Sequence, residues 1–362
     1  MKKFALPLWL CIQSFSVMAQ VNGGEHMFEF LRLSSAPHIT ALGGMSISNP
    51  SADVMMSTAN PALLRPEFHT TLGIVQNNYY AGTKVNNAYY AHHSRALQTT
   101  FGFGVQYFNY GTFTISDVNG TKQGDTRAND YSLQLSASRS YLTRWRYGMT
   151  LRFAHSNLIE KKASGILFDL GVIYADTSNR IYIASCVRNA GIAIKNYTPG
   201  ITQPMPIDLQ IGITKRFKKA PFSLQALAHH LYEWDIRYNN PADQTNNQLL
   251  LGDTSTTNKS YFADKLFRHF IFAAELNLGK RVEISMGYNH MRRAELAISE
   301  KKGMSGFSYG AGLYLNKFTL HFARSYYHIS GPYNELGLSI QLNQLIGSGG
   351  IAWTTHYASA YR

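Results

Sequence analysis

The sequence has 362 residues and a formal net charge of +13, and it combines 23 Tyr, 20 Phe and 29 Gly with only two Cys. If Cys11 belongs to a cleaved leader, only Cys186 remains, and one cysteine excludes an internal disulfide or a cysteine-rich metal site. A positive net charge suggests that the partner is nucleic acid or an anionic membrane surface. The export signal described next argues against nucleic acid.

Residues 1–19 have the features of a cleaved secretory signal peptide. Lys2 and Lys3 precede an apolar run, and a small-residue cleavage site ends at Ala19, so that Gln20 is the expected first mature residue. The apolar run is too short for a membrane helix, which needs about 20 apolar residues. No later apolar run approaches that length, so we expect an exported protein that does not cross a membrane with helices.

Residues 20–67 predict a plug, because they contain the one long mature segment that does not alternate like a strand. Asn49-Pro50-Ser51 is expected to cap a helix over residues 52–59, with Asp53 in its first turn. Asn60-Pro61 should end that helix, since the residue before proline avoids the helical region. We expect this segment to enter a barrel from the periplasmic side and to fill it.

From residue 68 to 344 the hydrophobic period is two. In the last segment, Leu336, Leu338 and Ile340 face one way, and the residues between them face the other. The pattern predicts strands over residues 68–80, 83–93, 97–110, 129–141, 144–157, 164–175, 180–190, 206–217, 221–235, 266–279, 281–292, 304–315, 317–328 and 333–344.

The length of each expected connection depends on whether the strand before it is even-numbered or odd-numbered. Connections after even strands are short, and those after odd strands are mostly long, as at residues 111–128 and 236–265. An even strand number, short periplasmic turns and longer outside loops are typical of outer-membrane barrels. The predicted fold is therefore all-β, a transmembrane antiparallel β-barrel of about 14 strands over residues 68–344 in the cell outer membrane. A flexible periplasmic tail, residues 345–362, follows.

The motifs of common catalytic sites are absent from the sequence. There is no Gly-x-Ser-x-Gly elbow, no phosphate loop and no His-Glu-x-x-His pair. The tandem pairs His92-His93 and His229-His230 are expected on strands, where neighbours point to opposite faces and cannot bind one metal ion together. We therefore expect no enzyme activity, no cofactor and no metal.

Four carboxylates are expected to point into the lumen: Asp169, Asp208, Glu275 and Glu335. An acidic group inside a barrel needs water or a partner. Plug groups such as Arg65 could pair with them, or they could line a transport path, and packing against the plug is the preferred interpretation. Glycines such as Gly102, Gly104, Gly310 and Gly312 either mark a bulge that opens toward lipid or allow close packing with the plug.

The plug residues Ser34-Ser35-Ala36, Ala41-Leu42-Gly43-Gly44, Asp53 and Asn60-Pro61-Ala62-Leu63 resemble the N-terminal signature of the FadL-like fourteen-stranded outer-membrane proteins. Within that superfamily the chain looks most like the PorV and PorQ subgroup of the Bacteroidetes type IX secretion system. The opening residues 28–33 look more like PorQ. The motifs are confined to residues 28–64, and Pro37-His38 replaces the basic residue that usually follows the Ser-Ala pair.

This resemblance implies a non-enzymatic outer-membrane component of the type IX secretion system. Such a protein scaffolds the attachment complex with PorU and PorV, holds PorZ at the surface, and serves cargo that carries a C-terminal sorting domain and is linked to lipopolysaccharide. The outside loops, above all residues 236–265, would be the partner surface. The alternative that the superfamily implies is a FadL-like transporter of hydrophobic small molecules.

Overall fold

The computed structural model describes residues 26–236, 262–296, 303–328 and 331–346. The expected signal peptide, most of the expected loop 236–265 and the tail from residue 347 lie outside these residues. Within the described residues, no helix combines the length and the apolar character needed to cross a membrane.

Fourteen antiparallel strands in the described residues form one closed barrel, as the alternation and the loop parity predicted. The strands are β1 (Thr71–Asn78), β2 (Lys84–Ser94), β3 (Thr99–Ser116), β4 (Lys122–Tyr141), β5 (Trp145–Leu158), β6 (Lys161–Asp176), β7 (Ile181–Lys195), β8 (Asp208–Arg216), β9 (Phe222–Ala228), β10 (Phe270–Leu278), β11 (Val282–Asn289), β12 (Phe307–Tyr314), β13 (Phe318–His328) and β14 (Gly331–Gln341). Each strand pairs with its neighbours in sequence, and β1 closes the ring against β14.

The two faces of the wall differ in polarity. On β4, Leu133 and Leu135 are exposed on the outside, whereas Ser132 and Ser136 are buried on the inside. Closure satisfies the backbone hydrogen bonds of every strand, and an apolar outer face can then contact lipid. The outward residues of the other strands repeat this pattern, so the barrel has the surface of a membrane-spanning wall.

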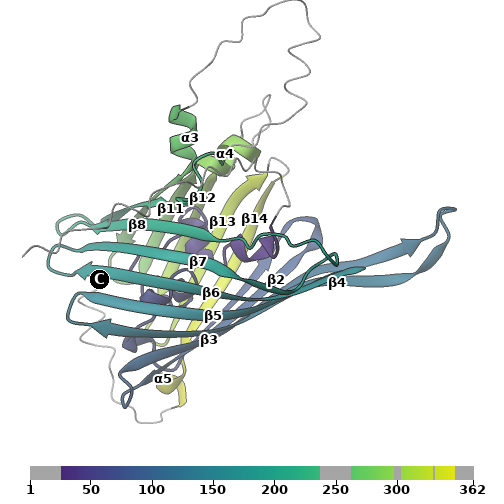
Figure 1. Cartoon of the computed structure of the whole chain (residues 1–362). Coiled ribbons are helices and arrows are strands. Elements are labelled where there is room, and N and C mark those ends of the chain that lie inside the picture. The colour runs from purple at the N-terminus through teal and green to yellow at the C-terminus, as the bar shows by residue number, and fades with distance from the viewer. Residues whose placement is uncertain (1–25, 237–261, 297–302, 329–330, 347–362) are drawn as a thin grey trace, which may run out of the picture.

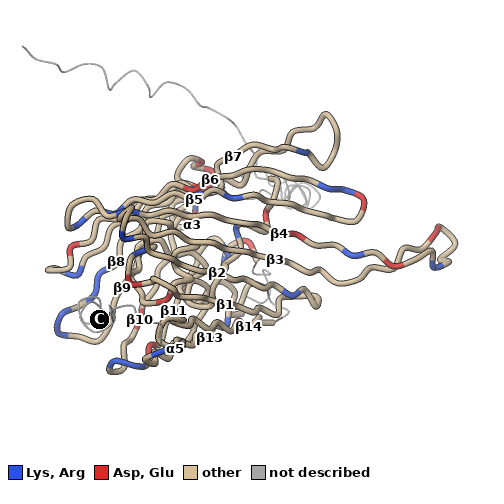
Figure 2. Tube along the Cα trace, turned by 90° about the horizontal axis from the view of Figure 1, so that it is seen from below, with Lys and Arg blue, Asp and Glu red and all other residues tan. Residues whose placement is uncertain are grey.

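One expected loop is instead a continuation of two strands. Residues 111–128 were expected to connect β3 and β4 as a long loop, but β3 continues to Ser116 and β4 begins at Lys122. The resulting hairpin projects well beyond the rest of the barrel (Figures 1 and 2). The prediction failed because the apolar alternation on the β3 side is limited to Phe113 and Ile115, and residues 122–127 on the β4 side are polar. The strand register continues across a shift between Asn109 and Thr112.

The plug is a chain of short helical turns inside the barrel: η1 (Glu29–Arg32), α1 (Pro37–Ala41), η2 (Val54–Thr58), η3 (Pro61–Leu63) and η4 (Pro66–Phe68). Figure 1 shows it in purple, enclosed between the teal strands in front and the yellow strands behind. The expected helix over 52–59 is the shorter 3₁₀ turn η2. Its cap is Asp53, whose side chain accepts a hydrogen bond from the Met55 backbone, rather than the Asn49-Pro50-Ser51 segment.

The described plug crosses the lumen from end to end. Its start lies at the outer mouth, where the Met27 backbone donates to Pro204 in the β7–β8 connection. Its end lies at the periplasmic rim, where η4 leads into β1. The expectation that the plug begins on the periplasmic side is therefore wrong for the described residues.

Glycines in the wall make room for the plug. A Cβ at Gly148 of β5 would lie 2.5 Å from the backbone carbon of Pro61, and one at Gly337 of β14 would lie 2.8 Å from Pro37. Of the four glycines considered above, Gly310 contacts plug residue Ala41, while the other three pack against side chains of the wall itself. These glycines thus serve close packing.

The remaining helical elements lie at the two rims. Those at the outer rim are η5 (Tyr80–Gly82), α3 (Phe262–Arg268) and α4 (His290–Leu296), and α5 (Leu342–Ile346) follows β14 at the periplasmic rim. Arg268 of α3 connects the two outer helices, because its guanidinium contacts Asp264 at 2.9 Å and Glu295 of α4 at 3.2 Å.

Candidate functional site: the interface between plug and barrel

Two glutamates lie side by side on the inner wall. The register of β10 and β11 pairs Glu275 with Ser285 and Asn277 with Glu283. The two carboxylates are therefore diagonal neighbours on one face of the sheet. Both are buried, and buried charges of the same sign require a compensating group.

The plug supplies that group through His38. Pro37 occupies the first turn of α1, and the next residue, His38, points into the wall. Its Nε2 lies 2.7 Å from Glu275 Oε1 and 2.9 Å from Glu283 Oε1, and the imidazole is fully enclosed. We call His38, Glu275 and Glu283 the plug lock.

The protonation state of His38 follows from two opposing effects. Burial alone would lower its pKa, but the negative charge of Glu283 and the hydrogen bonds to both glutamates outweigh burial and raise the pKa well above 6.5. The raised pKa favours the imidazolium form of His38, which is the form that compensates the two glutamates.

Neighbouring groups complete the hydrogen bonding of the plug lock. Glu275 accepts hydrogen bonds from plug residue Asn49 at 2.6 Å and from Ser223 of β9 at 2.8 Å. Glu283 accepts one from the Tyr314 hydroxyl at 3.2 Å. Such saturation of buried polar atoms fixes the plug in one position.

A second set of polar contacts anchors the plug on β14. Glu335 accepts a hydrogen bond from Thr40 of α1 at 2.7 Å and another from the Asn77 side chain. Asp53, besides capping η2, accepts a hydrogen bond from Ser339 at 2.9 Å. Both plug contacts therefore reach β14, while the hydrogen bond from Asn77 to Glu335 joins β1 to β14 across the seam.

The other two carboxylates predicted to face the lumen contact the wall rather than the plug. Asp169 forms an ion pair with Arg152 at 2.9 Å, and it also accepts a hydrogen bond from the Asn189 backbone. Asp208 accepts one from the Gln210 side chain at 2.6 Å. Arg65, the plug group suggested as a partner, instead donates to the Ser51 backbone at 2.6 Å.

The signature residues of the plug determine its shape. Gly43 and Gly44 adopt positive φ angles of 94° and 91°, which favour glycine. Asn60 caps η3 through the Ala62 backbone, while its amide donates to Ile47. Pro61 opens that turn, and the remaining signature residues pack in the core; these are Ala41, Leu42 and Ala62.

One tandem histidine pair departs from the sequence prediction. His92 and His93 lie on β2, with neighbouring side chains on opposite faces as expected. His229 and His230 lie beyond the end of β9, and His230 has a φ of 53°. This left-handed turn brings their Nδ1 atoms to 2.6 Å. The argument from strand alternation is therefore wrong for this pair.

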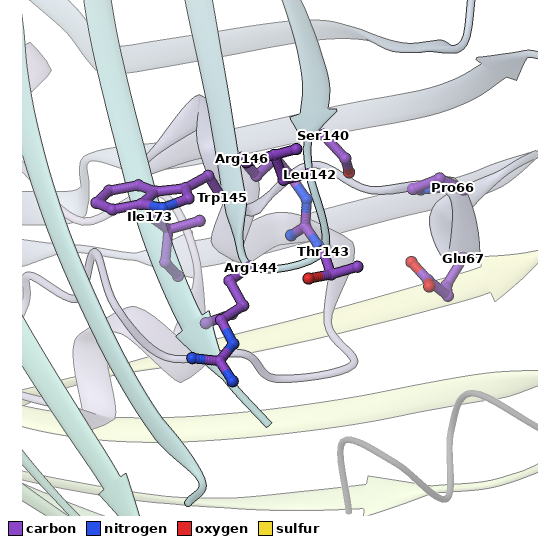
Figure 3. Close-up of a pocket in the computed structure, with 10 residues that line it drawn as sticks. Pro66, Glu67, Ser140, Leu142, Thr143, Arg144, Trp145, Arg146 and Ile173 are labelled. Carbon is purple, nitrogen blue, oxygen red and sulfur yellow. The ribbon is translucent and has the colours of Figure 1, made fainter. Parts of the chain in front are cut away.

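A small cleft of about 210 Å³ lies at the periplasmic rim, between η4 and the β4–β5 turn. Figure 3 shows Glu67 on one side and Arg144 and Arg146 on the other. Arg144 donates a hydrogen bond to the Tyr174 hydroxyl at 3.0 Å. The lining residues include no histidine or cysteine, and nothing in the cleft indicates catalytic chemistry.

The sequence matches no family model and no curated protein. Similar solved structures include the monoaromatic hydrocarbon channel CymD, at 11% identity over 85% of this chain and 97% of that chain, with a TM-score of 0.48. A TodX monoaromatic hydrocarbon channel mutant matches at 11% identity over 85% and 98%, with a TM-score of 0.47. A Pseudomonas aeruginosa FadL homologue matches at 10% identity over 84% and 98%, with a TM-score of 0.41. Similarity at these levels assigns no function to this chain.

Proposed function

We propose that this protein is a sealed outer-membrane barrel that acts as a scaffold at the cell surface. The observation that carries the proposal is the plug, which spans the lumen and is anchored through His38, Thr40 and Asp53. A plug with this many buried polar partners is costly to displace, since breaking a buried ion pair alone costs about 3–5 kcal/mol. Such an interior favours a structural role over conduction.

The resemblance in the plug motif supports a more specific proposal. On that basis the protein holds a PorZ-like surface protein for the attachment complex of the type IX secretion system, together with PorU and PorV. Its outer rim offers two surfaces for such a partner. One is the extended β3–β4 hairpin, and the other is the segment around residues 236–265, which lies mostly outside the described residues.

A second candidate is a transporter of hydrophobic small molecules. A buried apolar cluster lies toward the outer end of the lumen, where Phe30 of the plug packs against Phe108 of β3 and Phe28 packs against Phe30. A plug rearrangement at this cluster would expose an apolar site toward the outside. The names of the similar solved structures point toward this candidate and give no support to the secretion system.

Deletion of the gene in its source organism separates the two candidates. The scaffold proposal expects loss of surface attachment of proteins with the type IX sorting domain and loss of the PorZ-like protein from the cell surface. Uptake of toluene and of long-chain fatty acids should remain normal. Lost uptake with normal attachment would instead establish the transporter.

Two shortened variants locate the partner surface. One lacks residues 113–126, the distal part of the hairpin, and the other lacks residues 237–261. Each serves as the matched control for the other, because both leave the plug and the membrane-spanning wall intact. Loss of the partner with one variant identifies the binding segment, and full retention with both would overturn the assignment to these surfaces.

A further inference from the structure

We propose that His229, His230 and Asp208 form a binding site for a transition-metal ion such as Zn²⁺ at the outer mouth of the barrel. The three ligand atoms lie within 4.8 Å of one another. The site is independent of the plug lock, and the three residues come from adjacent strand ends. Asp208 begins β8, and the histidines follow β9.

Backbone hydrogen bonds hold the three residues in place. The His230 backbone donates to Asp208 Oδ1 at 2.7 Å, and the His229 backbone donates to His269 at 3.0 Å. The left-handed turn at His230 directs its ring toward that of His229. A non-glycine residue is strained in this conformation, and the surrounding contacts must offset the strain.

The close approach of the two Nδ1 atoms is the feature that a metal ion would occupy. The two Nδ1 atoms at 2.6 Å can share only one proton. With the ion at Nδ1, the ring proton of His229 lies on Nε2, which is buried and has no hydrogen-bond partner among the residues that the structure describes.

The geometry requires little adjustment to accept an ion. His230 Nδ1 lies 3.9 Å from Asp208 Oδ1. Two imidazole nitrogens around a tetrahedral Zn²⁺ lie about 3.3 Å apart, given Zn–N distances of about 2.0–2.1 Å. The rings therefore need to separate by less than about 1 Å. Gln210 donates to Asp208 Oδ2 and so orients the carboxylate, as outer-shell partners do.

The chemistry of the ligands selects the class of ion. Two imidazole nitrogens and one carboxylate suit Zn²⁺, Cu²⁺ or Fe²⁺, whereas Mg²⁺ and Ca²⁺ prefer oxygen ligands throughout. His269 is not a ligand, because its ring nitrogens contact the carbonyls of His229 and Trp234.

Metal titration of the full-length protein in detergent tests this proposal. After chelator treatment, the protein should bind one equivalent of Zn²⁺, and Co²⁺ should give the visible absorption of a low-symmetry site with nitrogen ligands. The double substitution His229→Gln with His230→Gln should weaken Zn²⁺ binding at least 100-fold. The matched control is His92→Gln with His93→Gln, which removes the other tandem pair and should leave binding unchanged.

If the double variant does not reach the folded barrel, Asp208→Asn provides an independent test and should weaken binding about 10-fold or more. Folding is checked by heat-modifiable migration in gels. Absence of a stoichiometric site in the unaltered protein would overturn the proposal. Equal binding by the His229/His230 variant and the His92/His93 control would also overturn it.

Discussion

At the scale of single residues, His38 shows what the sequence could reveal and what it could not. Alternation placed Glu275 and Glu335 inside the barrel, and both contact the plug. The same alternation places Glu283 on the inner face. Its role was missed because the partner is a plug histidine 245 positions earlier, which only the packed structure brings within 2.9 Å. Long-range pairing of this kind leaves no local pattern.

The raised pKa of His38 predicts a pH-dependent stability. A group whose folded pKa lies above its unfolded value stabilises the fold fully below about pH 6.5, and this contribution is lost as pH rises through the folded pKa. His38→Gln should lower the free energy of unfolding by about 3 kcal/mol at pH 6. The deficit should shrink at alkaline pH. Denaturant unfolding in detergent at several pH values measures it.

Ser46→Ala is the control for this prediction. It removes one neutral hydrogen bond between the plug and Gln225, at 2.9 Å, and should cost about 1 kcal/mol at every pH. A deficit for His38→Gln that does not change with pH would show that the imidazolium is not the source of its stabilisation.

At the scale of elements, the strands were predictable and the plug was predictable only in outline. Each strand has one apolar face, and this local signal gave the number and order of strands. The β3–β4 extension has only Phe113 and Ile115 on such a face, and strand pairing beyond the wall maintains it. The sequence placed Asp53 in the first turn of a longer helix, whereas Asp53 caps η2 by accepting a hydrogen bond from the Met55 backbone.

The fit between wall glycines and plug can be tested at Gly148. Gly148→Val would place side-chain atoms against the Pro61 backbone and should destabilise the protein by about 1–3 kcal/mol, as overpacked positions do. The adjacent Met149 is exposed on the outer face, so Met149→Val should change stability by less than about 0.5 kcal/mol. Thermal unfolding in detergent compares them, and equal effects would contradict the close fit.

At the scale of the whole molecule, the loop parity predicts which rim faces the outside. The strand order shows that odd and even connections lie at opposite rims, and which of these rims faces outside stays a prediction. The sequence did not predict that the described plug begins at the outer mouth, because only the contact between Met27 and Pro204 reveals its path.

Cysteine labelling of intact cells tests the orientation. Val118→Cys at the tip of the β3–β4 hairpin is fully exposed and should react with a bulky maleimide that does not cross the outer membrane. Thr143→Cys in the β4–β5 turn should react only after the cells are broken. The native Cys186 is buried and provides an unreactive background. Labelling of Thr143→Cys in intact cells would reverse the orientation.

The path of the plug also constrains how the protein is made. The plug precedes β1 in the chain and spans the lumen, and the ring closes only when β1 pairs with β14, the last strand. Thr40 and Asp53 both reach β14 from inside. We therefore expect the wall to wrap around the plug during membrane insertion. In this order of assembly the plug is a template for the circumference of the barrel, and an insertion machine would release the finished protein only after the seam had closed over its own N-terminal segment.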